Sequence, residues 1–123
     1  LYGESAEARA RDEETSLKPA VFNNTAFVTL GDWQQAVYPG VRGHQPDRSA
    51  AQEQFVGVSG AMDFIRAATP RGGSYANEGS YFTKDWQSEF WGANYPRLLA
   101  IKKKYDPGNL FRVHLGVGSE LTP

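Results

Sequence analysis

The sequence contains no cysteine, and its two histidines, His44 and His114, stand far apart in the chain. Without cysteine, a disulfide framework, a Cys-ligated zinc site and a thiol nucleophile are all excluded. The two histidines form no H-x-x-x-H pair, so no metal site is expected. Apolar runs are short, and no membrane-spanning helix is expected either.

Neither sign of charge is in excess, because 13 Lys and Arg stand against 14 Asp and Glu and give a formal net charge of −1. A protein that binds nucleic acid by neutralising phosphates needs a basic excess on one face. The run Lys102–Lys104 suits the last turn of a helix, where cations interact favourably with the helix dipole. A nucleic-acid partner is therefore not expected.

The 123 residues suffice for one domain, and their pattern predicts both strands and helices. Residues 1–18 are polar and charged, which favours an exposed tail over a solvated helix. Because the chain begins at Leu1 rather than at Met, we expect this end to result from processing. Residues 21–30 alternate β-branched and aromatic side chains, which predicts a strand. A second, short strand is expected at 74–77.

Two helical regions are predicted as well. The first begins at Ser49, with a capping-box pattern, and ends before Pro70. Its apolar residues share one helical face; they are Phe55, Val58, Met62 and Ile65. The second region runs over 85–105, bends at Gly92 and uses Asn94 as the cap of its second half.

Aromatic residues are dense in the stretch 75–95. They are Tyr75, Tyr81, Phe82, Trp86, Phe90, Trp91 and Tyr95. Aromatic side chains bury a large area each. The stretch therefore predicts a core that docks onto something larger.

A set of short motifs follows in one order between Gly72 and Glu120. These motifs are Tyr75-x-Asn77-Glu78, Trp86, Phe90-Trp91-Gly92-x-Asn94-Tyr95-x-Arg97-Leu98, Ile101-Lys102, Tyr105-Asp106-Pro107, Asn109-Leu110-Phe111 and Val117-Gly118-Ser119-Glu120. Together they resemble the C-terminal signature of the berberine-bridge-enzyme-like FAD-linked oxidases, members of the vanillyl-alcohol-oxidase superfamily. They look most like the fungal secreted members of that family.

The resemblance implies the C-terminal fragment of a two-domain flavoprotein of the α+β class. Residues 1–18 would be an exposed tail, and residues 19–71 would end the substrate-binding domain, as part of an antiparallel sheet with helices. Residues 72–120 would form the C-terminal segment that packs on the FAD domain. The partner implied is the N-terminal FAD-binding part of the same protein, as a separate chain that carries the residues for covalent FAD attachment.

The resemblance assigns the catalytic role to Tyr75, which would take the proton of a substrate hydroxyl while hydride passes to flavin N5. A phenol with the ordinary pKa of about 10 is a poor base at neutral pH unless a neighbour stabilises its phenolate. Asn77 would face the same side of a strand as Tyr75 and bind the flavin through its amide. The alternatives are a Tyr75 ring that fills the core and an Asn77 amide that satisfies a local turn.

His114 occupies a position at which relatives often carry a polar residue near the cofactor. The resemblance therefore implies a neutral hydrogen-bonding group that contacts FAD, and a surface or packed histidine is the alternative. Asn23-Asn24-Thr25 is an N-glycosylation sequon, which fits a secreted protein. Glycosylation of Asn23 is expected on this basis, and the mass of protein from a eukaryotic host checks it.

The function implied is that of a flavoenzyme. The chain would be part of an FAD-dependent oxidoreductase that oxidises an alcohol or saccharide hydroxyl of a small molecule and passes the electrons to oxygen, giving hydrogen peroxide. A rival hypothesis is a freestanding, non-enzymatic interaction module with an aromatic docking surface. Such a module would fold alone and bind no flavin.

Overall fold

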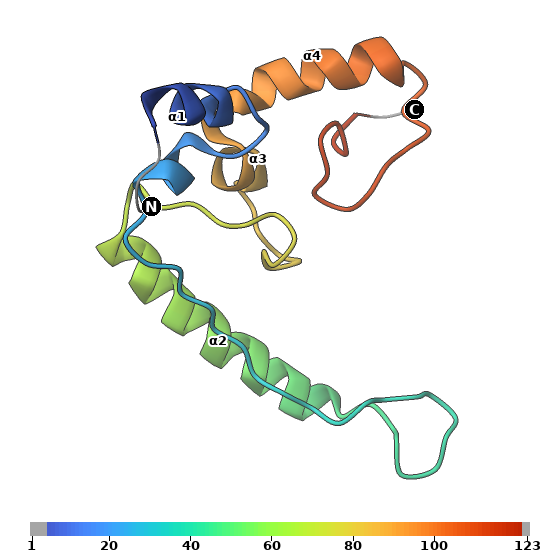
Figure 1. Cartoon of the computed structure of the whole chain (residues 1–123). Coiled ribbons are helices and arrows are strands. Elements are labelled where there is room, and N and C mark those ends of the chain that lie inside the picture. Colours follow the sequence, from blue (N-terminus) through green and yellow to red (C-terminus); the bar gives the residue numbers. More distant parts are fainter. Residues whose placement is uncertain (1–4, 122–123) are drawn as a thin grey trace. The chain divides into compact units, whose positions relative to one another are not determined.

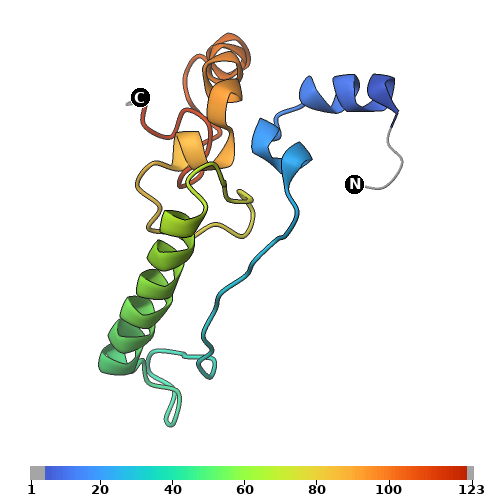
Figure 2. The same cartoon turned by 90° about the vertical axis from the view of Figure 1, so that its left-hand side faces the viewer.

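The computed structural model describes residues 5–121. The chain divides into two compact units, one of which is Ala26–Pro70 (unit 2). The other, unit 1, combines the segment that ends at Thr25 with the segment that begins at Arg71 (Figures 1 and 2). None of the described helices is long and apolar enough to cross a membrane.

The prediction of an α+β fold with an antiparallel sheet is wrong, because no strand occurs among residues 5–121. The expected strand 21–30 begins inside a short 3-10 helix, η1 (Pro19–Asn23), and continues as chain without regular secondary structure. Residues 74–77 run into a turn, closed by a hydrogen bond of 3.0 Å from Glu78 N to Tyr75 O. Alternating side chains favour an extended backbone, but a strand also needs a neighbouring backbone to pair with.

Unit 1 begins with α1 (Ala6–Glu13), so the solvated helix rather than the tail describes these residues. The hydroxyl of Ser5 caps α1 by accepting a hydrogen bond of 3.2 Å from Ala8 N. Such a cap satisfies one of the N–H groups that a helix leaves unpaired at its start.

The second helical region agrees with its prediction and consists of α3 (Trp86–Phe90), the 3-10 turn η2 (Gly92–Asn94) and α4 (Tyr95–Tyr105). The break falls at Gly92, whose φ of +53° lies in the left-handed region that glycine adopts without a steric penalty. Asn94 does not cap α4 with its side chain. Its amide instead donates a hydrogen bond of 2.6 Å to the carbonyl of Leu17.

Side-chain hydrogen bonds fasten the chain that follows α1 to residues that are remote in sequence. The guanidinium of Arg97 donates to the carbonyls of Glu14 and Thr15, at 3.1 and 2.7 Å. The ammonium of Lys18 donates to the carbonyl of Gly72, at 2.7 Å. The Arg97 contacts satisfy carbonyl groups just beyond the end of α1, where the helix supplies no further N–H partners.

The core of unit 1 is aromatic and small. Among residues 5–121, the buried hydrophobic side chains are Phe22, Trp86 and Phe90. The Trp86 ring meets Trp91 and Tyr95 edge to face, with ring centres 5.8 and 5.5 Å apart. A Cβ added to Gly79 would lie 2.6 Å from the Phe90 ring, so the backbone itself packs against this cluster.

Unit 2 consists of an extended segment and the long helix α2 (Arg48–Ala68). The helix is capped by Asp47, whose carboxylate accepts from Ala50 N at 3.0 Å, and not by Ser49 as predicted. Gln54 of α2 donates a hydrogen bond of 3.2 Å to the carbonyl of Trp33 in the extended segment. No described residue of α2 is fully buried, although Val58, Met62 and Ile65 of the predicted apolar face are half-buried.

Candidate functional site

The turn 75–79 brings Tyr75 and Asn77 together. The Asn77 amide donates a hydrogen bond of 2.7 Å to the Tyr75 hydroxyl oxygen. Ser74, just before the turn, is held by α3, because its N–H donates to the carbonyl of Glu89 at 3.0 Å and its hydroxyl to the Glu89 carboxylate at 2.7 Å. The two side chains were expected on one face of a strand, whereas a turn brings them together and joins them by a hydrogen bond.

Asn77 and His114 line the same pocket, which has a volume of about 300 Å³. The turn, the end of α3 and the C-terminal loop supply its walls. The lining residues are Ala76, Asn77, Gly79, Ser80, Tyr81, Phe90, Trp91, Val113, His114, Leu115 and Gly116. Tyr75, which is 45% exposed, is not one of the lining residues, and its link to the pocket is its hydrogen bond with Asn77.

His114 is held against Tyr81. The two rings are stacked, with their centres 3.8 Å apart and an interplanar angle of 21°. His114 Nε2 lies 2.7 Å from the carbonyl oxygen of Tyr81. A carbonyl only accepts hydrogen bonds, so Nε2 carries the proton, and Nδ1 is the ring nitrogen that can accept one in the neutral form.

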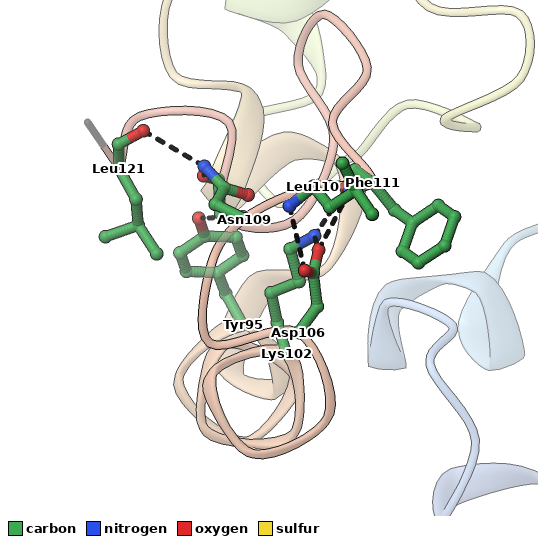
Figure 3. A network of polar contacts seen from close by, with 8 residues as sticks. Tyr95, Lys102, Asp106, Asn109, Leu110, Phe111 and Leu121 are labelled. Carbon is green, nitrogen blue, oxygen red and sulfur yellow. Dashed lines mark hydrogen bonds and ion pairs between the residues drawn. The ribbon is translucent and has the colours of Figure 1, made fainter. Parts of the chain in front are cut away.

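The C-terminal loop after α4 is ordered by Asp106 (Figure 3). Its carboxylate accepts hydrogen bonds from Leu110 N at 2.8 Å and from Phe111 N at 2.9 Å. It also pairs with Lys102, whose ammonium reaches the carbonyl of Phe111. The hydrogen bond from Lys102, together with those two backbone N–H groups, lowers the pKa of Asp106 below its ordinary value.

A second group of contacts ties the end of this loop to α4 (Figure 3). The Tyr95 hydroxyl donates to the Glu120 carboxylate at 2.5 Å and accepts from Gly118 N at 3.3 Å. The Asn109 amide donates to the carbonyls of Gly118 and Leu121, at 3.2 and 3.0 Å. Asn109 itself has a φ of +49°, a conformation that asparagine tolerates better than most residues.

These contacts predict an alkaline transition of the loop. Burial first, and then the hydrogen bond to Glu120, raise the pKa of Tyr95 to about 12. An unfolded phenol has a pKa of about 10. The neutral phenol therefore stabilises the folded loop fully below pH 10, and this contribution is lost as the pH rises towards 12. The difference in phenolate absorbance between the wild type and Tyr95→Phe measures it, and ionisation of Tyr95 in step with an ordinary tyrosine would contradict it.

Sequence reasoning found part of this site. It identified Tyr75, Asn77 and His114, but not Tyr81 as the ring on which His114 stacks. Tyr81 belongs to the aromatic stretch, and composition alone does not indicate which ring of such a stretch lines a pocket. Among residues 5–121, no three His, Asp or Glu side chains gather in a way that could hold a metal ion.

The residues of the glycosylation sequon are not among those that line the pocket. Asn23 is exposed, at the end of η1. Its side-chain oxygen accepts a hydrogen bond of 2.6 Å from Arg9, whereas a glycan is attached to the side-chain nitrogen. Glycosylation of Asn23 stays a prediction.

The match to a known family covers the segment that builds this site. Residues 74–118 match the family described as "Berberine and berberine like". The chain is 42% identical over 76 residues to the VAO-type flavoprotein oxidase VAO615 of Thermothelomyces thermophilus. The aligned region covers 62% of this chain and 13% of that protein. It is 45% identical over 60 residues to the FAD-linked oxidoreductase ZEB1 of Gibberella zeae, and this aligned region covers 49% of this chain and 11% of that protein.

A longer match reaches beyond the C-terminal segment. The chain is 37% identical over 108 residues to the FAD-linked oxidoreductase easE of Arthroderma benhamiae, which covers 87% of this chain. It spans 20% of that relative, and less of the two others. No solved structure matches the chain. Through residues 74–118, the chain belongs to the berberine and berberine-like family.

Proposed function

We propose that this chain is the C-terminal part of an FAD-dependent oxidoreductase. The observation that carries the proposal is the hydrogen-bonded pair Tyr75 and Asn77 at a pocket that Asn77 shares with His114, inside the segment that matches the family. The relatives are named flavoprotein oxidase and FAD-linked oxidoreductase, which supports the same reaction class.

The residues around the pocket fit one end of a flat heteroaromatic ring. Asn77 offers an amide donor and acceptor, Ser80 a hydroxyl, and His114 the free nitrogen Nδ1. Tyr81 and Trp91 supply aromatic faces on the same lining. At about 300 Å³ the pocket lies at the lower end of the ligand-site range, so it suits part of a flavin and not a whole dinucleotide.

The proposed roles follow from the chemistry of these groups. Bound FAD supplies the hydride acceptor, and oxygen as final electron acceptor would give hydrogen peroxide. Oxidation of a hydroxyl-bearing carbon to a carbonyl removes a hydride from carbon and a proton from oxygen, and we assign the proton to Tyr75 Oη. The Asn77 amide orients that oxygen and stabilises negative charge on it. The substrate class proposed is a small-molecule alcohol or a saccharide.

The partner proposed is the FAD-binding part of the same protein. Leu110, Phe111 and Val113 are 79, 78 and 70% exposed and lie on the loop that walls the pocket. Exposed apolar side chains that gather on one surface are typical of an interface. We therefore propose that this loop packs on the protein that holds the remainder of the flavin.

The visible absorption spectrum of the natively purified protein tests the proposal, together with a denaturing gel and the intact mass. The expected result is a yellow sample in which a larger polypeptide, or a longer form of this chain, carries flavin. A colourless, monodisperse species with the mass of this chain alone would contradict it. That outcome would favour the freestanding interaction module, for which the exposed loop is the docking surface.

A further inference from the structure

The C-terminal loop supplies four residues of the pocket lining, yet no helix or strand lies between α4 and residue 121. These four residues are Val113, His114, Leu115 and Gly116. A segment without a hydrogen-bonded ladder needs other partners to hold its backbone in one place. Besides the contact with Tyr81, the position of His114 therefore depends on contacts that hold the loop backbone from outside the pocket lining.

Asp106 supplies the contacts on the N-terminal side of His114. Its carboxylate binds the N–H groups of Leu110 and Phe111, and its partner Lys102 binds the carbonyl of Phe111. The peptide units that lead to His114 are thus held on both their donors and an acceptor. The Asp106 and Lys102 side chains are each 12% exposed, so solvent and salt screen this pair less than a surface ion pair.

The loop on the far side of His114 shows that its conformation is imposed. Leu115 has a φ of +55°, which costs energy for any residue with a Cβ and persists only where the surroundings fix it. A Cβ added to Gly116 would lie 2.5 Å from the Val113 side chain, so the loop is also tightly folded. Beyond it, Gly118 is held by Tyr95 and Asn109. His114 therefore lies between two sets of contacts, those of Asp106 at Leu110 and Phe111 and those at Gly118. The Asp106 contacts are nearer to His114 in sequence and involve a charged group, which forms the stronger hydrogen bonds.

We propose that Asp106 is a positioning residue for His114: it fixes the loop 110–117 so that the imidazole stays stacked on Tyr81 in the pocket lined by Asn77. The inference rests on the proposed function, in which this pocket holds part of the flavin. Asp106 touches no residue of the lining itself in the described contacts, so it acts on the site through the loop.

The first test is the rate at which diethyl pyrocarbonate modifies His114, read by peptide mass spectrometry on the whole protein. Asp106→Asn keeps the shape of the side chain and removes its charge. We expect it to raise the rate at His114 by about 5- to 10-fold, the effect of losing about one hydrogen bond. His44, which lies in unit 2, is the internal reference and should react at an unchanged rate.

Asp85→Asn is the matched control. Asp85 is exposed, and its side chain makes no capping hydrogen bond to α3. It should leave the rate at His114 unchanged. If circular dichroism shows that Asp106→Asn is unfolded, Lys102→Gln replaces it in the test. This variant removes the charged partner of Asp106 on α4 and so weakens the same contacts to the loop. Equal rates at His114 in the wild type and in the folded variant would overturn the proposal.

The second test is a double-mutant cycle on turnover. Asp106→Asn should lower turnover by about 10-fold in the wild type and should have no further effect in a His114→Ala background. Additive losses would overturn the proposal. The modification rates can be measured without flavin. A colourless, inactive wild type would therefore contradict the proposed function, and the modification rate at His114 would still test whether Asp106 positions that residue.

Discussion

Replacing Tyr75 by phenylalanine is expected to lower turnover by about 10²-fold or more, which is the usual effect of losing a general base. The variant keeps the ring and removes the oxygen to which the Asn77 amide donates. Because Tyr75 is 45% exposed, the free energy of unfolding should change by no more than about 0.5 kcal/mol. Steady-state oxygen consumption, with an alcohol or saccharide that the wild type oxidises, measures the loss.

Tyr105→Phe is the matched control for this experiment. Tyr105 ends α4, is 75% exposed and lies outside the pocket lining. Removing its hydroxyl should leave turnover and the flavin spectrum unchanged. Wild-type turnover in Tyr75→Phe would show that another group takes the proton.

Replacing Trp86 by alanine is expected to destabilise unit 1 by about 3–5 kcal/mol, the usual cost of deleting a large buried side chain. Trp86 is 7% exposed and is one of the few hydrophobic side chains that are buried among residues 5–121. Its edge-to-face contacts with Trp91 and Tyr95 add about 0.5–1.5 kcal/mol each. Since domains are stable by only about 5–15 kcal/mol, this single loss should remove much of the total.

Urea denaturation followed by circular dichroism measures that change, and Trp33→Ala is the matched control. Trp33 is 77% exposed in unit 2. Its replacement should change the free energy of unfolding by no more than about 0.5 kcal/mol. Equal effects of the two substitutions would mean that the Trp86 cluster is not the core of unit 1.

The helix α2 and the second helical region could be predicted because their signals are local, whereas the polar α1 was expected to be a tail. The break at Gly92 and the Pro96 in the first turn of α4 are visible in the sequence and need no distant partner. The cap of α2 was predicted wrongly as Ser49, because Asp and Ser are both good N-cap residues and the sequence pattern does not show that the helix begins at Arg48, after Asp47. Asn94 shows the limit most clearly, because its amide binds Leu17, which is remote in sequence.

The strand prediction failed for a different reason. The alternating side chains in 21–30 favour an extended backbone. The described part of the chain, however, contains no strand with which this segment could pair. At the site, Tyr75 and Asn77 were expected on one side of a strand, whereas a turn brings them into the hydrogen bond that joins them. The stacking of His114 on Tyr81 depends on a fold of the whole loop, which no local spacing encodes.

The discontinuous make-up of unit 1 has a consequence for the order of events during synthesis. The N-terminal segment, up to Thr25, leaves the ribosome before Arg97, Asn94 and Gly72, to which it is later bound. Chains grow at about 5–20 residues per second, so this segment waits for seconds without its partners. Closing the loop costs entropy that rises only slowly with length, by about 0.6 kcal/mol per doubling. Insertions in the intervening Ala26–Pro70 should therefore delay the completion of unit 1 more than they weaken it.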